Sequence, residues 1–118
     1  MLQILDLTHR DIIAVEVDGK LKKEDYDKVD PLIDKAVKDF DKIKLYIRLN
    51  HVDGMEPAAL AEDVKTYLKH FNNLEKMAIV GKNQWEEIIT KLSGPFVSGE
   101  VRYFDFPEID SARKWIQN

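Results

Sequence analysis

The feature that most constrains this 118-residue chain is the segment KMAIVG, Lys76 to Gly81. Its residues are almost continuously apolar, which is typical of a strand buried on both faces. A strand of this kind belongs to a mostly parallel sheet that helices cover on two sides. We therefore expect Lys76 to Gly81 to be a central strand of an α/β domain.

Four other segments carry apolar residues at every third or fourth position, which predicts amphipathic helices. They lie between Leu21 and Phe40, from Pro57 to Asn73, from Asn83 to Gly94, and from Ile109 to the end of the chain. Pro31 falls inside the first of them. We expect a short turn from Lys23, followed by a main helix with Asp30 as its N-cap and Pro31 at its first position.

Strand-like segments alternate with these helices. The first nineteen residues contain two apolar segments separated by Thr8 to Asp11, which predicts a β-hairpin. In its second segment, small and acidic residues alternate with Ile13, Val15 and Val17, so that one face is apolar and the other becomes polar toward Gly19. β-branched and aromatic residues predict two more strands, Ile43 to Leu49 and Val101 to Phe106.

The order of elements is therefore β-β-α-β-α-β-α-β-α, in one domain spanning residues 1–118. Strands and helices that alternate in this way require right-handed crossovers between parallel strands. The fold class is α/β, with a five-stranded, mostly parallel sheet, an antiparallel N-terminal edge strand and four helices.

Composition excludes several classes of function. The chain has 44% hydrophobic and 34% charged residues, a balance typical of a soluble globular domain. Its net charge of -4 and interspersed charges do not provide the basic surface that nucleic acid requires. We expect no membrane span, no signal peptide and, with no cysteine, no thiol chemistry. The expected location is the cytoplasm.

Three stretches together resemble the STAS-like domains, in particular their SpoIIAA-like branch of small stand-alone bacterial proteins. They are IIAVEVDGKLKKEDYDKV, the strand KMAIVG with Trp85 in the following KNQWEE, and the ending VRYFDFPEIDSARKWI. The resemblance covers the whole chain. It implies a fold with five strands and four helices, similar to anti-sigma-factor antagonists and to the lipid-binding lobe of CRAL-TRIO proteins.

The antagonists of this family carry a phosphorylatable serine or threonine after the third strand, at the start of the second helix. The corresponding stretch here is NHVDGMEPA, Asn50 to Ala58, and it contains no Ser, Thr or Tyr. A phosphorylation switch adds charge to a hydroxyl, so it is not expected in this chain. Asp53 and Glu56 supply fixed negative charge, and the structural alternative is that they only stabilise the first turn of the helix.

Ligands of open α/β sheets usually bind at the carboxyl ends of the strands, where helix N-termini also lie. We expect a ligand or partner to contact Asn50, His51, Asp53, Gly54, Met55, Glu56, Lys82 and Asn83. Lys20 and Lys22 follow the second strand and belong to the same end. An alternative is an enzyme that uses His51 as a base oriented by Asp53, although neighbours two apart in a loop do not by themselves form such a pair.

An apolar cleft is a second candidate. Two glycines flank Phe96 and Val97 in GPFVSG, which could form a flap over a cleft beside Trp85 and Leu92. The alternative is that these side chains belong to the core.

The chemistry-bearing residues form no catalytic or metal motif. The histidines lie far apart in sequence, and none has the i, i+4 partner of a helical zinc site. We expect no cofactor and no metal. The expected function is a non-enzymatic domain that binds either a lipid-like small molecule or a protein partner, and the alternative is a regulatory protein-interaction module without the phosphorylation switch. The sequence leaves the oligomeric state open.

Overall fold

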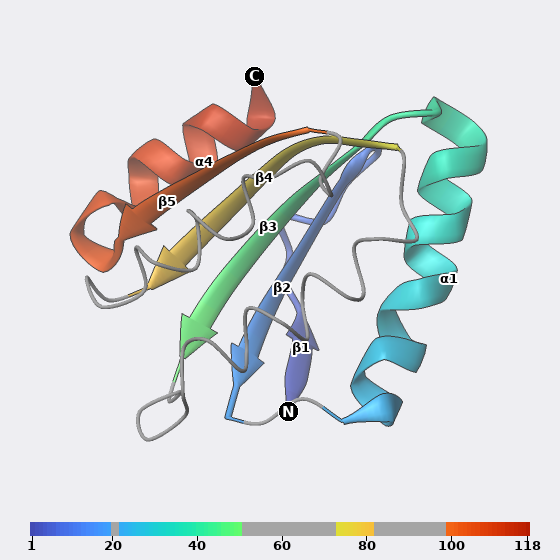
Figure 1. The fold of residues 1–118 in the computed structure, drawn as a ribbon, viewed down its shortest axis with the longest axis horizontal. Coiled ribbons are helices and arrows are strands. Elements are labelled where there is room, and N and C mark those ends of the chain that lie inside the picture. Colours follow the sequence, from blue (N-terminus) through green and yellow to red (C-terminus); the bar gives the residue numbers. More distant parts are fainter. Residues whose placement is uncertain (20–21, 51–72, 82–98) are drawn as a thin grey trace.

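A computed structural model of the protein describes residues 1–19, 22–50, 73–81 and 99–118. Within these residues, a twisted five-stranded sheet lies between two helices (Figure 1). The elements in chain order are β1 (Leu2–Ile4), β2 (Ile12–Asp18), α1 (Lys23–Phe40), β3 (Ile43–Asn50), β4 (Leu74–Gly81), β5 (Glu100–Asp105), the 3-10 turn η2 (Phe106–Glu108) and α4 (Ile109–Gln117).

The strands follow one another across the sheet in the order β1-β2-β3-β4-β5. β1 pairs antiparallel with β2, and the other neighbouring pairs are parallel. This confirms the predicted sheet with its antiparallel N-terminal edge. Lys76 to Gly81 lies in β4, an interior strand between β3 and β5 and next to the middle strand, so the predicted position inside the sheet is confirmed. The last five residues of β4 are buried, as its apolar run predicts.

The two faces of the sheet bury different side chains. On one face, Ile13, Val15 and Val17 of β2 pack with Val29 and Ile33 of α1. On the other face, the core contains small and aromatic residues of the sheet together with α4, namely Ala14, Tyr46, Ala78, Val80, Phe104, Ala112 and Ile116. Figure 1 shows α1 and α4 on opposite sides of the sheet. The alternation predicted for β2 is thereby confirmed.

Helix α1 differs from its prediction. It runs without a break from Lys23 to Phe40, with Pro31 inside it and Lys22 as the N-cap residue. The expected helix start at Asp30 and Pro31 is therefore wrong. A proline in a helix interior costs about 3 kcal/mol, because it lacks an N–H and its ring crowds the preceding turn. Burial of Val29 and Ile33 on either side of Pro31 keeps both turns against the sheet and offsets this cost.

The N-terminal hairpin is confirmed, with a shorter first strand than the apolar segment suggested. The backbone groups of His9 and Ile12 exchange two hydrogen bonds of 3.0 Å and close a tight turn. The Thr8 hydroxyl accepts a hydrogen bond from the Ala14 N–H at 2.9 Å and donates one to the Ala14 carbonyl at 3.0 Å. These contacts fix the turn to the amino end of β2.

The other predicted boundaries shift by one or two residues. Leu74 begins β4 and Asn50 ends β3, while Phe106, which was predicted to end the last strand, begins η2. Pro107 lies in the first turn of η2, where its missing N–H costs nothing. α4 follows with Ala112 and Ile116 buried, as its apolar spacing predicts. The helices predicted from Pro57 to Asn73 and from Asn83 to Gly94 lie almost wholly outside the described residues.

Candidate functional site

Polar side chains of β2 and β3 meet near the carboxyl ends of these strands. In the parallel register, Glu16 is opposite Arg48, and Asp18 is opposite Asn50. The alternation of side chains along a strand places Glu16, Arg48 and Asn50 on the sheet face that α4 covers, because Ala14 and Tyr46 lie at the same phase. We call Glu16, Arg48 and Asn50 the polar triad.

Hydrogen bonds join the members of the polar triad. Arg48 Nη2 donates to Glu16 Oε2 at 2.5 Å, and Asn50 Nδ2 donates to Glu16 Oε1 at 2.7 Å. Both carboxylate oxygens of Glu16 therefore accept a hydrogen bond. The Glu16 side chain is only 14% exposed, so this pair is screened less by water than a surface salt bridge. The triad holds its side chains in one arrangement.

The triad also orders the point where β3 ends. The Gly19 N–H donates to the Asn50 carbonyl at 3.3 Å, which continues the pairing of β2 and β3 by one residue. Asn50 is thus held by its carbonyl and by its side-chain amide. Asn50, which precedes most of the predicted contact residues in the sequence, therefore has a fixed position.

A buried carboxylate, Asp25, stabilises the same end of the sheet. Its oxygens accept hydrogen bonds from the backbone N–H of Lys22 at 2.8 Å and of Leu2 at 3.2 Å. The bond from Lys22 is half of a capping box at the start of α1. The hydrogen bond from the Lys22 N–H is the main cause that lowers the pKa of Asp25, and burial opposes it. The positive charge of the N-terminus and then the N–H of Leu2 lower this pKa further. One side chain therefore joins edge strand β1 to helix α1.

Tyr46 lies on the same face as the triad, two residues before Arg48. It is 2% exposed, and burial raises the pKa of its phenol. The positive charge of Arg48 acts against that shift. Tyr46 therefore remains a neutral core residue at physiological pH and carries no charge into the site.

The triad contains a carboxylate, a guanidinium and a carboxamide, all of which form hydrogen bonds with polar groups. Glu16 and Arg48 already pair with each other. The triad therefore contributes side chains in fixed positions and groups that form hydrogen bonds. No group of three or more acidic or histidine side chains gathers in a metal-binding arrangement in residues 1–19, 22–50, 73–81 and 99–118.

Of the residues predicted to contact a ligand or partner, Asn50 is described, and it is the last residue of strand β3, whereas the sequence predicted that it begins a loop. Lys22 is also described, as the exposed N-cap residue of α1. The other candidates lie outside the described residues: Lys20, His51, Asp53, Gly54, Met55, Glu56, Lys82, Asn83, Trp85, Leu92, Phe96 and Val97.

Gly99, the last residue of the predicted flap segment, is described. A Cβ atom on Gly99 would lie 2.5 Å from the Leu74 carbonyl oxygen. Close approach to the start of β4 therefore requires glycine at this position, with no need for a hinge.

Sequence reasoning missed Glu16 and Arg48. Each looks like an ordinary charged residue on a strand, and only the pairing of β2 with β3 makes them neighbours. The available signal was their opposite charge near the ends of two successive strands. This signal identifies the pair only when the register of β2 and β3 is known, because the register places Glu16 opposite Arg48.

The model of the SpoIIAA-like family matches residues 12–117 of the chain. This protein belongs to the SpoIIAA-like family. The match begins at the first residue of β2 and ends at the last residue of α4, so it includes the sheet, the polar triad and both described helices except for edge strand β1. The resemblance seen in the sequence is confirmed.

A solved structure supports the same assignment. It is the crystal structure of an uncharacterised protein of the DUF3478 family with a SpoIIAA-like fold, from Shewanella loihica PV-4. The two chains are 28% identical, with a TM-score of 0.64, over 98% of this chain and 93% of the other. No curated protein matches the chain significantly.

Across the part of the chain that the structure describes, no helix combines the length and the apolar character needed to cross a membrane.

Proposed function

We propose that this single-domain, cytoplasmic member of the SpoIIAA-like family is a non-catalytic binding domain. In this proposal it recognises a protein partner through the carboxyl end of its sheet. The observation that carries the proposal is the polar triad, in which Glu16 holds Arg48 at 2.5 Å and Asn50 at 2.7 Å. A rigid end of β3 lowers the entropy that the adjoining contact segment loses on binding.

In this proposal, the permanent charge of two carboxylates replaces the charge that phosphorylation of a hydroxyl would add. Residues 50–58 contain Asp53 and Glu56 but no Ser, Thr or Tyr. A phosphate would bring a charge of roughly -1.5 to -2, whereas these two carboxylates bring a permanent charge of comparable size. Binding is therefore expected to be constitutive, with a partner surface that carries Lys or Arg opposite the two carboxylates.

Charge reversal tests the proposal. The double variant Asp53→Lys/Glu56→Lys is compared with the control Asp27→Lys/Asp34→Lys, which changes the same charge at two exposed positions of α1. Crosslinking in cells, followed by mass spectrometry, identifies the partners of each protein. We expect the loop variant to lose a partner that the wild type and the control retain. Identical partner sets for all three proteins would contradict the proposal.

The triad is tested with the purified partner. Asn50→Ala removes the amide that Glu16 holds and leaves both loop carboxylates in place. We expect binding to weaken about fivefold to tenfold, since one hydrogen bond to a charged group is lost and the loop starts from a less ordered residue. Unchanged affinity would show that the triad is structural only and would remove the main support for this site.

A further inference from the structure

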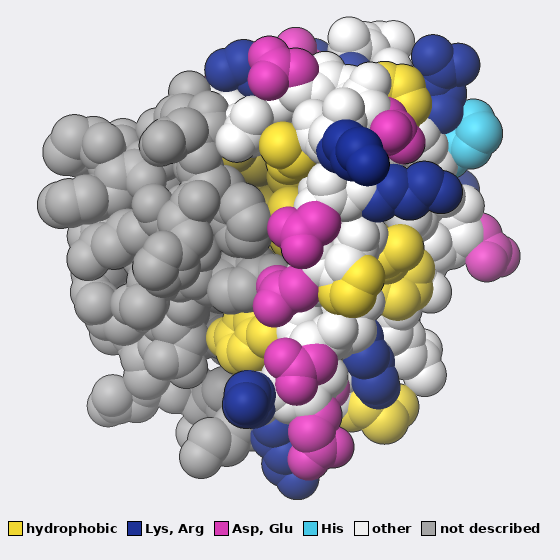
Figure 2. All heavy atoms as spheres, turned by 90° about the vertical axis from the view of Figure 1, so that its right-hand side faces the viewer, with side chains coloured by type: hydrophobic (Ala, Val, Ile, Leu, Met, Phe, Trp, Pro, Cys, Tyr) yellow, Lys and Arg dark blue, Asp and Glu magenta, His cyan; other side chains and the backbone are white. Residues whose placement is uncertain are grey.

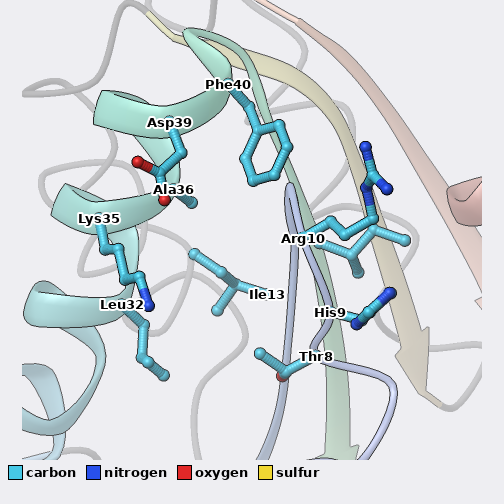
Figure 3. Close-up of a pocket in the computed structure, with 10 residues that line it drawn as sticks. Thr8, His9, Arg10, Ile13, Leu32, Lys35, Ala36, Asp39 and Phe40 are labelled. Atoms are coloured by element: carbon cyan, nitrogen blue, oxygen red, sulfur yellow. The ribbon is translucent and has the colours of Figure 1, made fainter.

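A groove opens at the opposite end of the sheet, between the β1-β2 turn and the second half of α1. It has a volume of about 330 Å³. Its floor is apolar and includes Ile13, Leu32 and Ala36, while Phe40 forms one wall. Figure 3 shows Lys35 and Phe40 on the side of the helix and His9 and Arg10 on the side of the turn, with Ile13 between them. The volume is near the lower end of the range for small-molecule sites.

The charge around this groove has the opposite sign from the charge of the whole chain. The chain has 18 basic and 22 acidic residues, whereas the groove is lined by Arg10 and Lys35 against one carboxylate, Asp39. Elsewhere on the face that α1 forms, acidic and basic side chains are interspersed and hydrophobic side chains form small separate patches (Figure 2). The rim of the groove therefore has an excess of one fixed positive charge.

Asp39 is the carboxylate that lines the groove together with the two cations. Within the described ranges, neither Arg10 nor Lys35 forms a salt bridge. The carboxylate next in sequence to Arg10, that of Asp11, instead lies 3.8 Å from Lys44 Nζ. The Arg10 guanidinium lies 5.5 Å from the centre of the Phe40 ring, a cation–π contact that leaves its N–H donors available to an anion.

The backbone at Arg10 is strained for a residue with a side chain. Its φ angle is 58°, in the left-handed region that glycine adopts readily and other residues adopt at a cost of about 1 to 2 kcal/mol. This conformation places an arginine at the tip of the turn beside the groove. Phe40 opposite is a large apolar side chain that stays 39% exposed. The Arg10 side chain and the exposed Phe40 ring are therefore both available to contact a bound ligand.

We infer that this groove binds a small organic monoanion, a carboxylate with an apolar tail. An arginine fork matches the two oxygens of a carboxylate, and Lys35 adds a second positive charge. One excess charge suits a monoanion better than a phosphate dianion. The tail would cover Leu32, Ile13 and the Phe40 ring, each buried methylene contributing to affinity. The site is independent of the proposed partner surface, which lies at the other end of the strands.

Titration with octanoate tests this inference, with acetate as the headgroup alone and 1-octanol as the uncharged analogue. Calorimetry gives the dissociation constants, and amide chemical shifts in two-dimensional NMR locate the binding site. We expect saturable octanoate binding with shifts in residues 8–13 and 32–40, weaker binding of 1-octanol and none of acetate. Absence of octanoate binding, equal affinity for 1-octanol, saturable binding of acetate, or shifts confined to the carboxyl end would overturn the inference.

Two variants and a control separate charge from folding. Arg10→Gly removes the guanidinium at a backbone angle that glycine accepts, and Lys35→Met keeps an unbranched side chain without its charge. Each should weaken octanoate binding about tenfold and leave 1-octanol binding unchanged. Lys38→Met removes the same charge from an exposed position of α1 that does not line the groove, and should bind octanoate as the wild type does. Equal weakening by Lys38→Met would show a general charge effect and contradict the inference.

Discussion

The carboxylates near the polar triad and the cations at the groove, at the two ends of the sheet, differ in how their charges are paired. At the carboxyl end, the carboxylates of Glu16 and Asp25 are mostly buried and are satisfied by hydrogen bonds from within the domain. At the amino end, Arg10 and Lys35 face an apolar groove and form no salt bridge among the described residues. Carboxylates that accept hydrogen bonds from the backbone and from neighbouring strands fix the position of the chain, whereas cations that form no salt bridge beside an apolar surface are suited to binding a ligand.

This contrast predicts that mutations at the two ends affect different properties. Removal of a paired charge at the carboxyl end should lower stability, because its buried partners lose their hydrogen bonds. Removal of a cation at the groove should leave stability nearly unchanged, or increase it, and affect binding alone. The following experiments are ordered by the size of the effect we expect.

Asp25→Ala should have the largest effect, a decrease of about 3 kcal/mol in the free energy of unfolding. It leaves the Leu2 and Lys22 N–H groups without their acceptor and separates β1 from α1. Urea denaturation followed by circular dichroism measures the change. The control Asp34→Ala alters an exposed residue of the same helix and should stay within about 0.5 kcal/mol of the wild type. A loss below 1 kcal/mol for Asp25→Ala would contradict the role assigned to this carboxylate.

The pH dependence of stability should report the same carboxylate. The folded pKa of Asp25 lies below the ordinary aspartate value of about 3.9. Its stabilisation is therefore complete above that value and is lost as the pH falls through the lower folded pKa. Denaturation midpoints between pH 7 and pH 2 should decrease more for the wild type than for Asp25→Asn. Parallel curves for the two proteins would mean that Asp25 is not responsible for the acid sensitivity.

Glu16→Ala should lower the free energy of unfolding by about 2 kcal/mol, because Arg48 and Asn50 lose a partly buried acceptor. Glu16→Gln keeps the shape and one acceptor oxygen and should cost about half as much. A double-mutant cycle with Arg48→Met isolates the interaction between the two charges. A coupling energy near zero would place this pair with ordinary surface salt bridges and weaken the contrast between the two ends.

Arg10→Gly should have the smallest effect on stability, and of the opposite sign. It relieves a positive φ angle and removes one cation–π contact, for a net gain of about 0.5 kcal/mol. The melting temperature measures this change. A clear loss of stability would show that Arg10 is there to hold the turn against α1, and not to contact a ligand.

Local patterns predicted most of the elements that the structure describes. The apolar run of β4, the alternation in β2 and the spacing in α4 each reflect burial of one or both faces, which is visible in a short window of sequence. Pro31 is the exception. Its local preference for a helix start was overridden by the burial of Val29 and Ile33, which is a tertiary effect.

The sequence by itself determined that this chain forms a mostly parallel sheet with helices on both faces and an antiparallel edge, and that its predicted contact loop has no phosphorylatable hydroxyl. Tertiary structure alone decided which charged residues meet. Glu16 and Arg48 are separated by 32 positions, and Arg10 and Lys35 come from a turn and a helix on different parts of the chain. The physical reason is that periodicity records burial within one element, whereas the triad and the groove depend on strand order, register and the packing of α1 on the sheet.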